Sequence, residues 1–436
     1  MHARRLLSLT VSHAVAFAVL AVSTSAETIH AIGRTLRELL ASAPPHSVIQ
    51  CDARETIVLT EPLLIGQPLT LIGLHARLPE KLGRTSLLVV EAPGVAVLDF
   101  ELTGSGKTVP QDQRAPLIKV HAGDFRIERG RLFDSSKDGI AITSGPDGQD
   151  VVGGVVRDIV GRRIIRDTVS ISGGDGGQVV RHVLVDNVRA YGSELRGAVE
   201  VSDGSDNITV RKVYAEECSY AIDVQDHKKP GQVNRNIVIE DVLAVRCRQA
   251  IVTNNRPLGH LNLTVRDATS LDCAAPFRFS HTANLQLSNL RIAYTADAPP
   301  VALPRELPRA PLIHLNNCHG VTLRDVVIEG PTRAVPAVLL ENCDEATIDG
   351  VALRRTASGS THAVVYRLAT AGHYSGLRIA NVRAGPNASG GILLERAGKE
   401  TTTLTDYRIT GNFSTVTDRI RGERGVIADN LPSATK

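Results

Sequence analysis

One apolar spacing recurs along most of the 436 residues of this chain. An apolar residue at position i is followed by others at i+2 and i+5, and the pattern returns after about 22 to 36 residues, the range for one turn of a solenoid. The copies are Leu69-Leu71-Leu74, Val95-Val97-Phe100, Val183-Val185-Val188, Ile208-Val210-Val213, Ile237-Ile239-Val242, Leu263-Val265-Ala268, Leu285-Leu287-Leu290, Val321-Leu323-Val326, Ala346-Ile348-Val351 and Leu377-Ile379-Val382.

The residue before i+5 predicts a sharp corner in each repeat. Asn, Asp and Gly adopt the left-handed backbone conformation at low cost, and most copies carry one of them there. These residues are Gly73, Asp99, Asn187, Asp241, Asp267, Asn289, Asp325, Gly350 and Asn381. The i and i+2 residues point to one face of a strand, so the i+5 residue begins the next strand and points inward again.

A second short run accompanies most repeats, with two apolar residues on either side of a variable one. Examples are Leu117–Val120, Gly139–Ile142, Ala198–Val201, Ala221–Val224, Pro276–Phe279, Leu312–Leu315 and Ala337–Leu340. Three short strands and three corners per repeat describe one coil of a parallel β-helix. We therefore expect an all-β, single-stranded solenoid of about 12 to 13 coils around one continuous core.

Cysteines recur at equivalent places in successive repeats. Cys218, Cys247 and Cys273 each lie five residues beyond the last anchor of their coil, and Cys318 and Cys343 each lie three residues before the first anchor. Free buried thiols are the favoured interpretation, because Cys behaves as a small core residue. A disulfide framework is the alternative, since adjacent coils bring Cα atoms within bridging range. No Cys-x-x-Cys or His/Cys spacing indicates a zinc site.

The two ends of the chain are expected to differ from the repeat. Residues 1–26 read as a signal peptide, with Arg4 and Arg5, an apolar stretch over 14–22 and small residues at 24–26, which predicts a secreted or periplasmic protein. Residues 27–60 form an expected N-terminal cap, including an amphipathic helix over 35–43 that covers the open end of the core. The β-helix domain is expected over 61–430, followed by a disordered tail over 431–436.

Export, an N-terminal cap and a long, irregular three-strand repeat resemble the pectin-lyase-like superfamily of right-handed parallel β-helix proteins. The resemblance covers about residues 50–415. It implies a right-handed coil and places the chain among polysaccharide lyases, polygalacturonases and non-catalytic adhesins and tail spikes. Fold alone does not assign an activity.

Polygalacturonase motifs are matched only in part. Its Asn-Thr-Asp-Gly corresponds to Ser136-Lys137-Asp138-Gly139, and its Asp-Asp-Cys to Arg166-Asp167-Thr168, with one Asp missing. The place of its Gly-His-Gly holds Arg196-Gly197-Ala198, and no Arg-Ile-Lys follows. These departures put an inverting hydrolase of that kind in doubt.

The outward residue of the second run gives a candidate site. Coil by coil it is Lys119, Ala141, Ser170, Glu200, Asp223, Val252, Arg278 and His314. Glu200 and Asp223 are expected about one strand spacing apart, an arrangement that a cation or a shared proton would relieve. Asp203 and Asp226 follow them in their coils, so we expect these four acids to bind Ca²⁺ through oxygen ligands.

The leading hypothesis is a lyase that cleaves an acidic, uronate-containing polysaccharide by β-elimination. Lys228 is the favoured base, with His227 and Arg278 as further catalytic candidates, and Lys229, His281 and Arg196 as candidates for substrate binding. A Lys acts as a base only where neighbouring cations or burial lower its pKa. The simple alternative is that these acids are solvated surface or turn residues.

Two other functions stay open, namely a non-catalytic polysaccharide-binding or surface protein and a divergent hydrolase using Asp138 with Asp167, or Glu200 with Asp223. The chain has no Trp, seven Tyr and seven Phe, which favours a charged glycan held by Arg and Lys over a neutral one held by stacking. Its 49 basic and 46 acidic residues do not indicate nucleic-acid binding. We expect a monomer without a membrane span in the mature protein.

Overall fold

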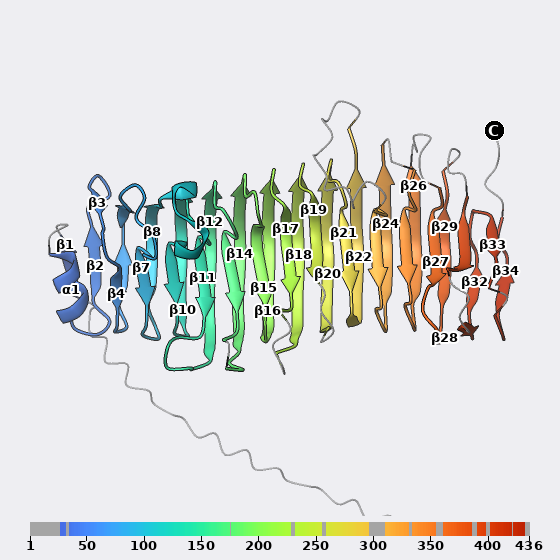
Figure 1. Cartoon of the computed structure of the whole chain (residues 1–436), viewed down its shortest axis with the longest axis horizontal. Coiled ribbons are helices and arrows are strands. Elements are labelled where there is room, and N and C mark those ends of the chain that lie inside the picture. The colour runs from blue at the N-terminus through green and yellow to red at the C-terminus, as the bar shows by residue number, and fades with distance from the viewer. Residues whose placement is uncertain are drawn as a thin grey trace, which may run out of the picture.

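The structure, a computed structural model, describes residues 27–31, 35–174, 176–227, 232–254, 259–295, 310–330, 334–354, 361–385, 390–397, 402–420 and 422–431. It confirms the expected all-β, right-handed parallel β-helix, with about 13 turns. The coils stack side by side in chain order to give an elongated solenoid (Figure 1). The predicted signal peptide over 1–26, residues 432–436 of the predicted tail, and the candidates Lys228 and Lys229 lie outside the described residues.

Two parallel sheets run the length of the solenoid, one of 18 strands and one of 14. The 14-stranded sheet contains β4 (Leu63–Ile65), β7 (Leu88–Val90), β9 (Ile118–Val120), β11 (Ile140–Thr143), β13 (Val169–Ser172), β15 (Gly197–Ser202), β17 (Tyr220–Gln225), β19 (Gln249–Asn254), β21 (Phe277–Ser280), β23 (Ile313–Asn316), β25 (Val338–Glu341), β27 (Val364–Leu368), β30 (Ile392–Arg396) and β33 (Val416–Asp418).

The strands of the 18-stranded sheet are up to 12 residues long. They are β1 (Thr28–Ala31), β2 (Val48–Cys51), β3 (Thr56–Val58), β5 (Thr70–Ile72), β6 (His75–Arg77), β8 (Ala96–Thr103), β10 (Phe125–Phe133), β12 (Val151–Arg162), β14 (Val180–Tyr191), β16 (Ser205–Glu216), β18 (Asn234–Val245), β20 (His260–Leu271), β22 (Thr282–Ala293), β24 (Thr322–Glu329), β26 (Thr347–Arg354), β29 (Arg378–Arg383), β32 (Arg408–Thr410) and β34 (Val426–Ala428). A separate pair joins β28 (Gly372–Ser375) to β31 (Thr402–Thr405).

The predicted corners are confirmed, and they explain why the long strands bend. All nine residues predicted before i+5 have positive φ, from 52° at Asn289 to 81° at Gly350. Two of the three short strands expected per coil are therefore continuous in the middle coils, as in β18, which turns at Asp241. Neighbouring coils bend at the same place, so the parallel pairing continues through the corner.

The interior is one continuous apolar core. The i, i+2 and i+5 residues are buried along the whole solenoid, and Phe277 and Phe279 point inward as the pattern predicts. All six cysteines are buried and free, which confirms thiols over a disulfide framework. Burying each Val, Leu or Ile side chain stabilises the fold by roughly 1.5–3 kcal/mol relative to exposure.

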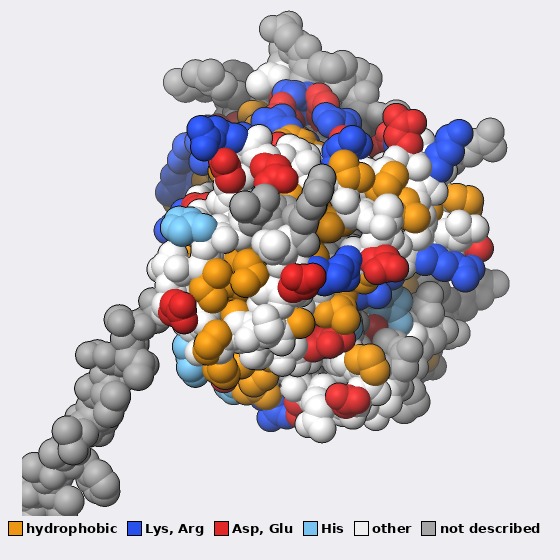
Figure 2. Space-filling model, turned by 90° about the vertical axis from the view of Figure 1, so that its left-hand side faces the viewer, with side chains coloured by type: hydrophobic (Ala, Val, Ile, Leu, Met, Phe, Trp, Pro, Cys, Tyr) orange, Lys and Arg blue, Asp and Glu red, His pale blue; other side chains and the backbone are white. Residues whose placement is uncertain are grey.

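A short helix lies at the N-terminal end of the solenoid. Helix α1 (Leu36–Ser42) buries Leu36 and Leu40 against the first coils, where the amphipathic pattern places them. Figure 1 shows α1 beside β2 at this end. In the view onto the same end, hydrophobic side chains are interspersed with acidic and basic ones (Figure 2). Within the described residues, the other helical segments are the 3₁₀ turns η1 (Gly106–Thr108) and η2 (Gln111–Gln113).

A second corner lies just before position i and holds Asn236, Asn262 and Asn284. Asp206, two residues before position i in its own coil, begins the same stack of polar side chains, and we call these four residues the corner ladder. Each Asn side-chain amide donates to the residue one coil earlier, over 2.8, 2.8 and 2.9 Å in order along the chain. The three Asn residues have φ of 55° to 57°. The ladder therefore joins four coils at their surface.

Candidate functional site

The predicted outward row lies on the 14-stranded sheet. Strand pairing aligns Ser170 with Glu200, Glu200 with Asp223 and Asp223 with Val252. The same register continues to Arg278 and His314. Residues that are far apart in the sequence are therefore neighbours about 4.8 Å apart across the sheet.

Four carboxyl side chains gather on consecutive coils of this sheet, and we call them the carboxyl cluster: Asp138, Asp167, Glu200 and Asp223. Asp138 and Asp167 lie just before β11 and β13, and Glu200 and Asp223 lie within β15 and β17. Each is at most 3% exposed. An outward position on a β-helix would ordinarily be solvated, so these side chains must be covered and paired by others.

Two arginines supply the pairing. The Arg196 Nη1 atom lies 2.6 Å from Glu200 Oε1 and 3.8 Å from Asp223 Oδ2. Arg166 reaches the other side of the cluster, with Nη2 3.3 Å from Glu200 Oε2 and Nε 3.4 Å from Asp138 Oδ1. The charge relief that the sequence suggested for Glu200 and Asp223 thus comes from guanidinium groups bridging several carboxyls.

Tyr220, on the same strand as Asp223, closes the cluster. Its hydroxyl donates to Asp167 Oδ1 over 2.9 Å, and the backbone N–H of Gly197 donates to the same oxygen over 3.2 Å. A Cβ atom at Gly197 would overlap the backbone oxygen and ring of Tyr220. Glycine in the Arg-Gly-Ala segment is therefore what allows Tyr220 to lie across the neighbouring coil.

Two carboxyl groups of the cluster, those of Asp138 and Asp167, favour the protonated form. Burial raises the pKa of Asp167 well above its usual value, and the nearby charges of Glu200 and Asp138 raise it further. Burial also raises the pKa of Asp138, against the opposing effect of the Arg166 charge. Both are therefore biased toward the neutral acid, whereas Glu200 accepts hydrogen bonds from two guanidinium groups and from Ser170 Oγ.

The basic side chains stay charged. Burial alone would lower the pKa of Arg196, but Tyr220 and Glu200 raise it above the usual value. Arg166 behaves in the same way, with Asp138 and Glu200 outweighing the effect of burial on its pKa. Burial raises the pKa of Tyr220 well above its usual value, which keeps its hydroxyl a donor to Asp167.

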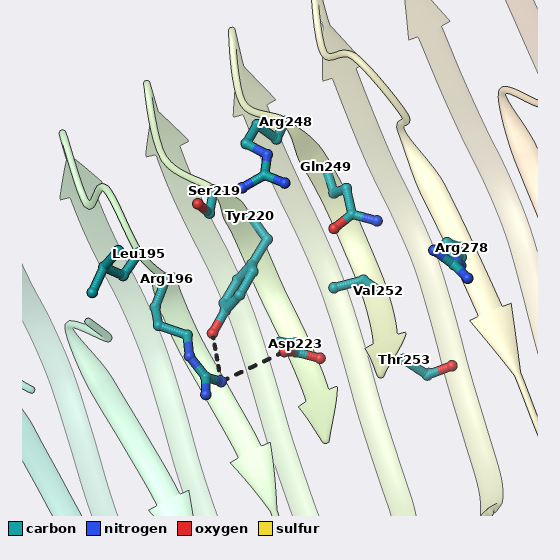
Figure 3. Close-up of a pocket in the computed structure, with 10 residues that line it drawn as sticks. All are labelled: Leu195, Arg196, Ser219, Tyr220, Asp223, Arg248, Gln249, Val252, Thr253 and Arg278. Carbon is teal, nitrogen blue, oxygen red and sulfur yellow. Dashed lines mark hydrogen bonds and ion pairs between the residues drawn. The ribbon is translucent and has the colours of Figure 1, made fainter. Parts of the chain in front are cut away.

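A groove of about 450 Å³ opens beside the cluster. It crosses the coils of β15, β17, β19 and β21, and Figure 3 shows side chains from all four directed toward it. Its lining is Leu195, Arg196, Ser219, Tyr220, Asp223, Arg248, Gln249, Val252, Thr253 and Arg278. Asp223 is the carboxyl of the cluster that lines this groove, and Arg196, Arg248 and Arg278 give the groove an excess of positive charge.

The remaining predicted acids lie together at the ends of these strands. Asp203 follows β15 and is 1% exposed, and its two oxygens accept from the backbone N–H of His227 and contact His227 Nδ1, over 2.9 and 2.7 Å. Asp226 follows β17 and is also buried. Among the described residues, Asp203 therefore pairs with His227.

The other candidates are distributed around the groove. Arg278 lines it, and Arg196 belongs to both the groove and the cluster. His281 lies in a left-handed corner after β21, where its carbonyl accepts from the backbone N–H of His260. For calcium, the described part of the chain contains no group of three or more His, Cys, Asp or Glu side chains arranged to hold a metal ion. We therefore derive no chemical step through Ca²⁺, which stays a prediction.

Sequence reasoning did not single out Gln225 or Arg248. Gln225 Oε1 accepts from Arg196 Nη1, so it completes the contacts of that guanidinium. A count of coil lengths would have found Arg248, because the pairing of Gly197 with Tyr220 and of Tyr220 with Gln249 puts Arg196 and Arg248 at equivalent positions.

No protein-family model matches this chain, and no curated protein matches it either. Among solved structures, the N-terminal fragment of bacteriophage Phi29 gene product 12 is similar, with 13% identity over 92% of this chain and 69% of that chain and a TM-score of 0.50. Endo-xylogalacturonan hydrolase from Aspergillus tubingensis has 12% identity over 78% of this chain and 92% of its own, with a TM-score of 0.48.

An iota-carrageenase complexed to iota-carrageenan fragments has 9% identity over 91% of this chain and 86% of its own, with a TM-score of 0.40. At 13% identity the likeness to the Phi29 protein shows the fold alone. Within the described residues, none of the helices has the length and apolar character needed to cross a membrane.

Proposed function

We propose that this protein is an exported enzyme that cleaves an acidic, uronate-containing polysaccharide bound in the groove over β15 to β21. The observation that carries this proposal is the position of Asp223, a buried carboxyl at the wall of a groove that also presents Arg196, Arg248 and Arg278. Arginine binds carboxylates in a planar, bidentate geometry, so this lining suits an anionic sugar better than a neutral one.

Hydrolysis is the cleavage that the cluster supports best. Glycoside hydrolases need one carboxyl that donates a proton and one that is ionised. The cluster offers two different environments, because the pKa of Asp138 and Asp167 is raised while Glu200 forms ion pairs with Arg166 and Arg196. We assign Asp223 as the carboxyl in contact with substrate, and Glu200 and Arg196 as residues that position it.

β-Elimination is the second candidate, and the His227–Asp203 pair favours it. With Nδ1–H of His227 donating to Asp203 Oδ2, Nε2 is the position that would take a proton from the substrate. The lyase hypothesis also includes the untested base Lys228 and the untested Ca²⁺ requirement. A binding protein without catalysis is the third possibility.

One assay separates these activities. The mature protein is incubated with pectate, alginate and glycosaminoglycans, with Ca²⁺ or with a chelator, and both reducing ends and ultraviolet absorbance are followed. We expect new reducing ends without the absorbance of an unsaturated product, unaffected by the chelator. Absorbance from unsaturated ends would establish the lyase instead, and binding without either product would establish a non-catalytic module.

Asp223→Asn tests the site. It should lower the rate by about 100-fold or more if Asp223 takes part in proton transfer or attack. Lys119→Gln is the matched control, because Lys119 lies in the same outward row three coils before Glu200. Full activity of Asp223→Asn would refute the site, and no binding or cleavage of any acidic polysaccharide would refute the proposed function.

A further inference from the structure

Two arginines of the groove occupy equivalent positions on alternate coils. Gly197 pairs with Tyr220, and Tyr220 pairs with Gln249. The residues just before these three are Arg196, Ser219 and Arg248, so a serine stands between the two cations. All three line the groove, and Figure 3 shows Ser219 just before β17, on the coil between them.

Both arginines have donors that the described residues do not use. Every hydrogen bond and ion pair of Arg196 within the described residues runs through Nη1, which leaves Nη2 and Nε for a ligand. Arg248 forms no ion pair with any residue that the structure describes, and its Nε is buried without a hydrogen-bond partner there. A guanidinium group with unused N–H donors beside a groove is a binding site for an anion.

The spacing of the two arginines restricts the ligand. Two strand spacings amount to about 9.5 Å along the solenoid axis. The groove crosses four coils, so an extended glycan within it runs along this axis and advances roughly one sugar per strand spacing. The coil between the arginines offers Ser219, whose hydroxyl already donates to the backbone oxygen of Glu194 over 2.7 Å.

We propose that the groove selects a polysaccharide that presents an anionic group on every second sugar, with Arg196 and Arg248 each binding one such group. This inference rests on the proposed function, because it assumes an acidic glycan in the groove. Two polymers present this pattern. One alternates uronate and neutral sugars, and the other carries a uronate on every sugar in a flat two-fold ribbon, with alternate carboxylates facing the groove.

The test compares binding of size-matched oligosaccharides by calorimetry, with the full mature chain. Unsulfated chondroitin hexasaccharide has a carboxylate on alternate sugars, hexagalacturonate has one on every sugar, and cellohexaose has none. We expect the two acidic ligands to bind with affinities within about tenfold of each other, since the groove uses the same two carboxylates of each. Cellohexaose should not bind measurably.

Arg248→Gln should weaken binding of both acidic ligands by about tenfold or more, because it removes a charge-assisted hydrogen bond. Arg235→Gln is the control, since Arg235 is exposed on β18 of the other sheet and its loss changes the net charge equally. It should leave both affinities within about twofold. An equal loss in the two variants would overturn the inference.

Ser219→Arg places a third cation on the coil between Arg196 and Arg248 and gives a second test. It should strengthen binding of hexagalacturonate by several-fold and leave the chondroitin oligosaccharide unchanged, with circular dichroism to verify folding. If hexagalacturonate binds the natural chain more than tenfold more tightly than the chondroitin oligosaccharide, the groove binds the carboxylate of every sugar. The inference then fails while the proposed function stands. If neither acidic ligand binds, the proposed function fails and this inference fails with it.

Discussion

The carboxyl cluster on the 14-stranded sheet and the corner ladder on the 18-stranded sheet are both built by stacking polar side chains on successive coils. In the corner ladder, exposed amides satisfy one another directly, each Asn donating to the coil before it. In the carboxyl cluster, the stacked groups repel each other and depend on Arg166 and Arg196. The same stacking therefore gives mutually satisfied surface hydrogen bonds in the corner ladder and buried, mutually repelling carboxyl groups in the carboxyl cluster.

The difference has an energetic consequence. A neutral hydrogen bond at the surface contributes on the order of 1 kcal/mol. Removing one partner from a buried ion pair costs about 3–5 kcal/mol, because the other charge stays buried without compensation. Such a cluster costs stability to maintain, as functional sites commonly do. The corner ladder needs no function to account for it.

The largest effect is expected from Glu200→Ala. It leaves Arg166 and Arg196, whose side chains are 27% and 23% exposed, without their shared carboxylate. Unfolding in urea should show a loss of about 3 kcal/mol or more. Glu101→Ala is the control, because it breaks a surface pair with Arg131 at 3.6 Å and should cost at most about 1 kcal/mol. Equal losses would remove the distinction between buried and surface pairs.

The second prediction concerns pH. The pKa of Asp167 in the folded protein is raised above its usual 3.8, mainly by burial. The unfolded chain then releases this proton first as the pH rises, so the folded state loses stability between the usual pKa and the raised one. Stability relative to an Asp167→Asn variant should therefore be greatest below about pH 4 and fall as the pH rises through this window.

Urea unfolding of both proteins across this pH range measures the effect. Asn keeps an oxygen that accepts from Tyr220 and Gly197, so the variant preserves these contacts while removing the titration. A parallel pH dependence of the two proteins would mean that Asp167 is ionised in the folded state. The assignment of a neutral acid in the cluster would then be wrong.

The sequence predicts the solenoid and the outward row because both follow from local rules. Left-handed corners need Asp, Asn or Gly, and strand alternation fixes which residue faces outward, so Glu200 and Asp223 are neighbours as expected. Their burial was not predictable in this way. It depends on the directions taken by the long side chains of Arg196 and Tyr220, which project from other positions in their coils. The strand register follows from residues close in the sequence, whereas the burial of Glu200 and Asp223 depends on side chains that project from elsewhere in the coils.

The smallest effect is expected from the corner ladder, and it is tested at Asn262. Asn262→Ala removes two surface hydrogen bonds and places a Cβ residue without a polar side chain at a φ of 57°. We expect a loss of about 1–2 kcal/mol in urea unfolding. Asn262→Gly separates the two causes, because glycine adopts this φ without strain. If Gly recovers most of the loss, the corner conformation is what Asn supplies. If the Gly and Ala variants are equally destabilised, the side-chain amides of the corner ladder themselves hold the coils together. Binding of acidic oligosaccharides in the groove should be unchanged in both variants.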